Sequence, residues 1–141
     1  MKIREFMTKN VITCSPDTTC FEAAKDMKSH DIGSMPVVQN NKLTGVITDR
    51  DIVIRCIAAN EDPKTTTVTT CMSKSPVTCS PETDAHEAAR LMASEQVRRL
   101  PVVENGSLIG MVALGDLAVI DIHIDEAGDA LSDISEQTHI H

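Results

Sequence analysis

Apolar and polar residues alternate along this chain with two different periods, and these periods predict its helices and strands. Residues 20–29 have apolar side chains at helical spacing, and Thr19 with Glu22 forms a capping box at the start of that run. Residues 35–38 and 43–47 are short apolar runs rich in β-branched residues and separated by turn-forming residues, a pattern typical of an antiparallel hairpin.

The residues before these elements complete a small repeating unit. Residues 1–10 are expected to form a short helical lead-in, residues 11–14 a short strand and residues 15–17 a turn. A further apolar-periodic run begins after Thr48 and predicts a second helix. The predicted order of elements in the unit is therefore β-α-β-β-α.

The start of this second helix is the first candidate for chemistry. Thr48 and Asp51 stand three residues apart, where a hydroxyl and a carboxylate cap the free N–H groups of a new helix. A helix N-terminus after a strand also attracts anions, and a carboxylate one turn along can accept hydrogen bonds from a sugar diol. One turn could thus hold a phosphate and a ribose, although most capping boxes only cap a helix.

The pattern then restarts, which shows an internal duplication. Residues 7–52 align with residues 72–117 at a constant offset of 65, and 19 of these 46 pairs are identical. Each half is too small to bury its apolar face well, so the halves are expected to pack together with pseudo-two-fold symmetry and a ligand cleft on that axis. The expected organisation is a first repeat with its lead-in over residues 1–59, a linker over 60–70, a second repeat over 71–121 and an acidic amphipathic tail over 122–141.

Composition narrows the classes of partner. The 141 residues include no Trp or Tyr and only two Phe, so the core is aliphatic and the stacking platforms of single-stranded nucleic-acid binders are missing. The net charge of −8 also disfavours nucleic acid, although residues 121–141 contribute −6 of it. No apolar run reaches the roughly 20 residues of a membrane span, so a cytoplasmic protein without membrane contact is expected. The five cysteines show no CxxC spacing and read as reduced, buried thiols.

Two motifs together resemble a known family. The turn at residues 45–51 and the strand at residues 99–103, each repeated at the offset of 65, are similar to those of tandem CBS-domain proteins, named after cystathionine β-synthase. The resemblance covers about residues 1–120 and points to the stand-alone bacterial and archaeal type, also called a Bateman module. It implies an α/β (α+β) fold, a homodimer, no required cofactor, and an adenosine-containing ligand such as AMP, ADP, ATP, S-adenosylmethionine or NAD.

The resemblance also assigns roles to the two turns. It implies that Asp51 accepts from ribose hydroxyls, that Thr48 meets phosphate, and that Arg50 supplements the phosphate site. The second turn keeps Asp116 but has Ala113 where the family has a hydroxyl. A phosphate there would lose one hydrogen bond, about 1 kcal/mol net, so the second site is expected to be weaker, narrower in ligand choice or vacant.

Further contacts follow from the same resemblance. Arg98 and Arg99 precede the second strand where the first repeat has Gly33 and Ser34, and family members often use a basic pair here to reach phosphates. The alternative is an exposed basic pair that balances nearby acids. The adenine is expected in an apolar slot bonded to backbone, and the alternative is that these are ordinary core positions. The implied slot positions are Ile12, Thr13, Met35, Thr78 and Leu100.

Three classes of function remain to be weighed. The first is a regulatory module that binds an adenine nucleotide and signals occupancy to a partner protein whose identity the sequence does not reveal. The second is an interaction or scaffold protein with vestigial sites, which Ala113 favours. An enzyme is not expected, because no nucleophile–base pair, metal constellation or Gly-rich phosphate loop is visible. His139 and His141 lack a third metal ligand, and the apolar stripe of the tail is expected to fold back or to pair across a dimer.

Overall fold

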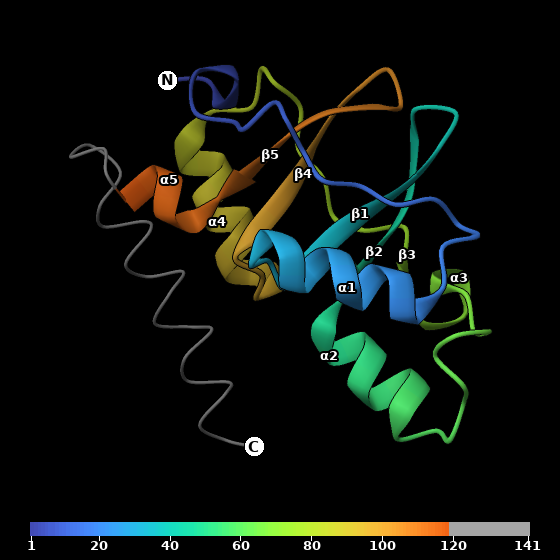
Figure 1. Cartoon of the computed structure of the whole chain (residues 1–141). Coiled ribbons are helices and arrows are strands. Elements are labelled where there is room, and N and C mark those ends of the chain that lie inside the picture. Colours follow the sequence, from blue (N-terminus) through green and yellow to red (C-terminus); the bar gives the residue numbers. More distant parts are fainter. Residues whose placement is uncertain (119–141) are drawn as a thin grey trace. The chain divides into compact units, whose positions relative to one another are not determined.

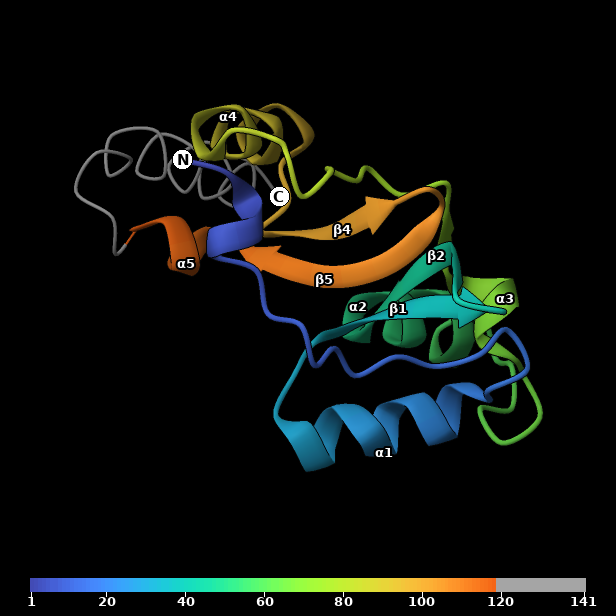
Figure 2. The same cartoon turned by 90° about the horizontal axis from the view of Figure 1, so that it is seen from above.

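The computed structural model describes residues 1–118, and these residues divide into two compact units (Figures 1 and 2). One unit is continuous and comprises residues 12–76. The other joins residues 1–11 to residues 77–118. The predicted tail over residues 122–141 lies outside the described residues. Within residues 1–118, none of the helices is long and apolar enough to cross a membrane.

The continuous unit contains the first repeat, built as a hairpin with helices packed against it. Strands β1 and β2 pair in antiparallel register, with Met35 opposite Ile47, and β3 pairs antiparallel with β2. This confirms the predicted hairpin. The elements are α1 (Cys20–His30), β1 (Ser34–Gln39), β2 (Lys42–Thr48), α2 (Asp49–Ile52), the π-helix η2 (Val53–Ile57), α3 (Val68–Cys71) and β3 (Ser73–Lys74).

Local chemistry explains where these elements begin and end. The Thr19 hydroxyl accepts a hydrogen bond from the backbone N–H of Glu22, which confirms the predicted start of α1. Helix α1 ends at Asp31 in the left-handed conformation, with φ of 53°. The hairpin turns at Asn40 and Asn41, both with positive φ, as a two-residue turn between right-twisted strands requires.

The core of the continuous unit lies between the hairpin and its helices. Met35, Val37 and Ile47 are fully buried and project from the strands to one face. Residues of all the helices in this unit pack against that face. They are Cys20, Ala23 and Met27 from α1, Ile52 from α2, Cys56 from η2, and Val68 and Cys71 from α3.

The second unit repeats this plan. Its hairpin has the same register at the offset of 65, so Arg99 pairs with Ala113 as Ser34 pairs with Thr48. Its elements are the 3-10 turn η1 (Ile3–Glu5), α4 (Ala85–Glu95), β4 (Arg99–Glu104), β5 (Ser107–Ala113) and α5 (Leu114–Ala118). The mixed α and β content and the paired repeats confirm the predicted fold class.

The segment before each repeat packs on the other repeat. The Ile3 N–H donates to the Thr83 carbonyl over 2.9 Å, and the Val68 N–H donates to the Thr18 carbonyl over 2.8 Å, which is the same bond at the offset of 65. Ile3 and Val68 are both fully buried. The predicted lead-in therefore completes the second repeat, and the end of the predicted linker completes the first.

We call this arrangement, in which the segment before each repeat packs on the other repeat, the segment exchange. Two glycines make the exchange possible. A Cβ on Gly45 would lie 2.7 Å from the Ser73 carbonyl oxygen, and one on Gly110 would lie 2.9 Å from the Thr8 carbonyl oxygen. Both distances are too short for a side chain, so the incoming segment reaches each strand only because the strand has a glycine there. This explains why the Gly45–Gly110 pair is identical in the two repeats.

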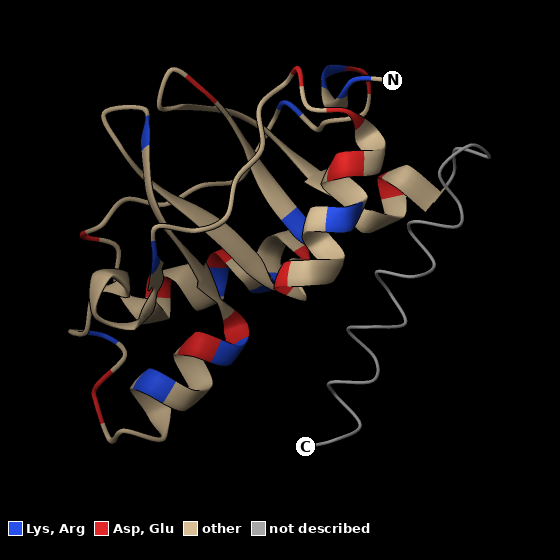
Figure 3. Ribbon diagram, turned by 180° about the vertical axis from the view of Figure 1, so that it is seen from behind, with Lys and Arg blue, Asp and Glu red and all other residues tan. Residues whose placement is uncertain are grey.

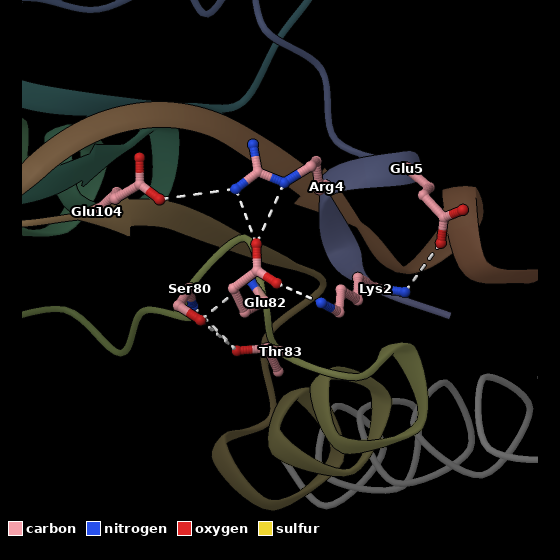
Figure 4. A network of polar contacts seen from close by, with 7 residues as sticks. All are labelled: Lys2, Arg4, Glu5, Ser80, Glu82, Thr83 and Glu104. Carbon is pink, nitrogen blue, oxygen red and sulfur yellow. Dashed lines mark hydrogen bonds and ion pairs between the residues drawn. The ribbon is translucent and has the colours of Figure 1, made fainter.

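The N-terminal segment is also held to its unit by charge (Figure 4). The Glu82 carboxylate accepts from the Lys2 ammonium over 2.6 Å and from the Arg4 guanidinium over 2.8 Å, and Arg4 lies 3.6 Å from Glu104. Hydrogen bonds from Lys2 and Arg4 hold the pKa of Glu82 below its ordinary value. These side chains are about half exposed, so they guide the segment more than they stabilise it.

One local prediction was wrong, and two predicted helical elements are present in a different form. Residues 11–14 form only one parallel bridge, between Cys14 and Val37, because Pro36 has no N–H with which to extend the pairing. The lead-in is a single 3-10 turn, since the chain then extends to pair Thr8 with β5. The helix after Thr48 is α-helical only through Ile52 and continues as the π-helix.

Candidate functional site

The turn that joins β2 to α2 is the best-formed polar feature of the first repeat. The Thr48 backbone N–H donates to Asp51 Oδ2, and the Asp51 backbone N–H donates to Thr48 Oγ1, both over 3.0 Å. The predicted capping box is therefore present in full, and both side chains are half-buried. Thr48 is the last residue with extended backbone, and the strand ends here because Asp49 begins the helix that Thr48 caps.

The capping box leaves chemical capacity unused. Thr48 Oγ1 accepts a hydrogen bond within the box, and its own O–H proton donates to no residue within residues 1–118. Asp51 uses Oδ2 in the box, and its Oδ1 accepts no hydrogen bond from the residues that the structure describes. The turn thus offers one hydrogen-bond donor, as a phosphate oxygen requires, and one anionic acceptor, as a sugar hydroxyl requires.

The matching turn in the second repeat keeps the carboxylate but not the hydroxyl. The Ala113 backbone N–H donates to Asp116 Oδ2 over 3.0 Å, which reproduces half of the capping box. Ala113 has no side-chain oxygen to accept the reciprocal bond. Asp116 therefore has the same orienting contact as Asp51, while this turn has no side-chain donor.

The structure places Arg98 and Arg99 beside this second turn. The Leu114 N–H donates to the Arg98 carbonyl over 2.7 Å, and Arg99 is the strand partner of Ala113. Both arginines are exposed, and no salt bridge is formed by either within residues 1–118. The turn that lacks a hydroxyl is thus the turn with two arginine residues next to it along the backbone.

The first turn has the opposite arrangement. Gly33 and Ser34 occupy the positions of the two arginines, and the Asp49 N–H donates to the Gly33 carbonyl over 2.9 Å. Basic and acidic positions alternate along α2 and η2, so no single sign dominates this helix (Figure 3). Arg50 is exposed on the first turn of α2 and is the nearest cation in sequence to Thr48.

The predicted adenine positions divide into two groups. Met35 and Leu100 are fully buried in the cores of their units, so their side chains offer no surface to a ligand and any contact would come from backbone. Ile12 is half-buried against the first core, whereas Thr13 and Thr78 are exposed.

Thr13 opens onto a polar pocket that the sequence did not indicate. The pocket has a volume of about 260 Å³ and lies in the continuous unit, between the start of the repeat and α1. The offset of 65 reveals what is special about it, because Asp26 corresponds to Leu91 in the second repeat. The lining residues are Thr13, Cys14, Thr18, Glu22, Lys25 and Asp26.

Comparison with known proteins supplies the family. The CBS domain model matches residues 3–57 and 68–122. The CBS domain-containing protein YhcV of Bacillus subtilis is 45% identical over 135 residues, which cover 96% of each chain. Uncharacterized protein YlbB of the same organism is 41% identical over 137 residues, covering 96% of this chain and 92% of YlbB.

Two solved structures are similar over most of the chain. Hypoxic Response Protein I, described with two coordinated zinc ions, has a TM-score of 0.79 and 33% identity, covering 85% of this chain and 98% of its own. CBSX2 in complex with AMP has a TM-score of 0.75 and 27% identity, covering 88% and 98%. Within residues 1–118 of the present chain, His, Cys, Asp and Glu side chains form no cluster of three that could hold a metal ion.

Proposed function

This chain belongs to the CBS-domain family, and we propose that it is a regulatory module that binds an adenosine-containing ligand and signals occupancy to a partner protein. The proposal rests on the Thr48–Asp51 turn. Its capping box has a hydroxyl proton and a carboxylate oxygen that bond to no residue within residues 1–118 and can contact a ligand. The AMP complex of the structurally similar CBSX2 supports the choice of ligand class. AMP, ADP and ATP are the first candidates, followed by S-adenosylmethionine and NAD.

The test is a thermal-shift panel of these five ligands, with guanosine and cytidine monophosphates as controls. A ligand that binds only the folded state raises the melting temperature with concentration, by an amount set by its dissociation constant. Asp51→Asn keeps an oxygen for the helix cap but replaces the free acceptor by a donor, so it is expected to abolish the shift. Asp49→Asn, on the same helix turn, is the matched control and is expected to leave the shift unchanged.

Ala113 favours a second candidate, an interaction protein with vestigial sites. On that reading none of the five ligands raises the melting temperature, and Asp51→Asn alters only the stability of the fold. An adenosyl ligand that shifts the wild type but not Asp51→Asn rules this reading out.

We further propose that the functional form is a homodimer. Val53, Ile54 and Ile57 on η2 are each more than half exposed, and they are three of the five large exposed apolar side chains within residues 1–118. A helix face of this kind is typical of a protein contact. Light scattering after size exclusion is expected to give twice the 15.3 kDa chain mass, and Ile54→Asp is expected to give the monomer. A wild type that is monomeric at micromolar concentration would contradict this.

A further inference from the structure

Three of the five cysteines lie together in the core of the continuous unit. Cys20 begins α1, Cys56 lies in η2 and Cys71 ends α3, and all three are fully buried. The Sγ atoms of Cys20 and Cys71 are 3.8 Å apart, in direct contact. The other two cysteines, Cys14 and Cys79, are each buried near a strand and have no thiol contact within residues 1–118.

This thiol pair belongs to the first repeat alone. At the offset of 65, Cys20 corresponds to Ala85, and Cys71 corresponds to Phe6 in the exchanged N-terminal segment. The second unit builds the same plan with a methyl group and a phenyl ring at these positions. The fold therefore does not need sulfur at either place, and packing alone does not explain two thiols in contact.

We propose that Cys20 and Cys71 are a redox pair that forms an intramolecular disulfide in the presence of a peroxide. Their Sγ atoms are already in contact, and a disulfide requires them to approach to about 2.05 Å. The two residues are 51 positions apart, so the bond would join α1 covalently to α3.

The chemistry balances with one hydrogen peroxide for each pair. One cysteine, as its thiolate, attacks a peroxide oxygen and becomes a sulfenic acid, and the departing hydroxide leaves as water once protonated. The second thiol attacks the sulfenic sulfur, the S–S bond forms, and a second water departs. Two thiols lose two electrons and two protons, and the peroxide is reduced to two waters.

Burial sets the conditions for this reaction. Desolvation raises the pKa of Cys20 to about 12, and it also raises the pKa of Cys71, so thiolate is scarce while the core is closed. The pair is therefore expected to stay reduced until the segment next to it, residues 58–66, opens away from the core. The Cys20 N–H donates to the Thr66 carbonyl over 2.8 Å, and most of residues 58–66 are exposed, as expected for a segment that opens locally.

The position of the pair gives the disulfide a consequence. Helix α3 leads directly into β3, which pairs with β2, and β2 ends at the Thr48 turn. A bond between Cys20 and Cys71 would hold α3, and with it β3, against the first repeat. Oxidation is thus expected to restrict the movement of α3 and β3. Because β3 pairs with β2, which ends at the Thr48 turn, this effect does not depend on which ligand the turn binds.

The experiment uses the full chain and hydrogen peroxide as the probe. After incubation the protein is denatured, its free thiols are alkylated and its peptides are mapped by mass spectrometry. We expect two alkylation sites to be lost, a Cys20–Cys71 cross-linked peptide to appear, and both changes to reverse with dithiothreitol. The melting temperature of the oxidised chain is expected to rise by several degrees, because the bond restricts the unfolded chain.

Matched variants separate the pair from its surroundings. Cys20→Ala introduces the residue already present at Ala85 and is expected to abolish the cross-link, and Cys71→Ala is expected to do the same. Cys56→Ala removes the neighbouring third thiol and is expected to keep the cross-link. The proposal is overturned if wild-type protein retains five alkylatable thiols after long exposure near its melting temperature, or if the mapped bond joins Cys56. Mapping of the wild type decides this even if a variant fails to fold.

Discussion

Asp51 and Asp116 cap their helices in the same way, and in the proposed function each is also a ligand-binding residue. Each accepts a backbone N–H with Oδ2 and so orients its carboxylate at the start of a helix. Only Asp51 has a hydroxyl beside it, and that hydroxyl completes the capping box. The two positions are thus equivalent in the fold and unequal in the chemistry that they offer.

We expect Asp51→Ala to weaken binding of AMP and ATP more than Asp116→Ala does. Loss of a hydrogen bond to a charged group corresponds to about 1.5–3 kcal/mol, which is more than tenfold in affinity. Each variant is also expected to lose about 1 kcal/mol of stability, because each removes a helix-capping contact. Calorimetric titration and chemical denaturation of both variants measure the two effects separately. Equal losses of affinity would show that the two turns bind equally well.

Arg98 and Arg99 are expected to favour phosphorylated ligands. They flank the Asp116 turn and are exposed, so AMP should bind more tightly than adenosine by a few kcal/mol at most. That advantage should shrink with added salt, because exposed charges are screened. Replacing the pair by Gly and Ser, as in the first repeat, is expected to remove it without unfolding the protein.

The measurement is a pair of titrations, AMP and adenosine, against wild type and the double variant at two salt concentrations. If the double variant keeps the full preference for AMP, the phosphate is bound by the Thr48 turn alone. The two arginines would then be ordinary surface residues.

At the scale of elements, the notable feature is a segment that precedes one repeat and completes the other. Ile3 in one unit and Val68 in the other fill equivalent core positions, and Gly110 and Gly45 let the following residues approach the strand. In the second unit, ion pairs at Glu82 add to this anchoring (Figure 4). No such ion pair is present at the equivalent place in the first unit within residues 12–76.

Acid is expected to loosen the N-terminal segment. Lys2 and Arg4 hold the pKa of Glu82 below its ordinary value, so the anchoring is present above about pH 4.5 and is lost as pH falls through the lowered pKa. Hydrogen exchange of residues 3–8 at pH 6 and pH 3 measures this loosening. At pH 6, Glu82→Gln is expected to give residues 3–8 the same protection, relative to the intrinsic exchange rate at that pH, that wild type gives them at pH 3. If wild type and Glu82→Gln respond identically to acid, the anchoring lies elsewhere.

At the scale of the whole molecule, the exchange decides which fragments can fold. A fragment cut within the linker, residues 1–62, lacks Val68, Cys71 and Met72, which are part of the first core. We expect it to show no cooperative thermal transition. Residues 12–76 contain that whole core, and we expect this fragment to show a cooperative transition, though a marginal one for its size. Circular dichroism melts of the two fragments decide the matter, and cooperative melting of residues 1–62 would contradict the assignment.

The sequence by itself determined the features that depend on near neighbours in the chain. The helix cap at Thr19, the capping box at Thr48 and the Asn40–Asn41 hairpin turn involve residues no more than three positions apart, so local pattern is sufficient to predict them. The offset of 65 added the duplication and the family, because two copies of the same pattern confirm one another. Thr48, Asp51 and Asp116 were therefore correctly located at the starts of helices.

Only the tertiary structure decided the features that depend on distant pairing. Periodicity does not say which hairpin a short extended segment joins, so the exchange of residues 1–8 and 66–74 could not be read from the chain. The same holds for the contact between Cys20 and Cys71, two thiols that lie 51 residues apart in sequence. The position of Arg98 and Arg99 likewise depended on strand register. The pairing of β4 with β5 placed them beside the turn that has no side-chain hydroxyl. Long-range contacts of this kind arise because an apolar face must be buried by whichever segment can reach it, and that choice is made in space rather than along the sequence.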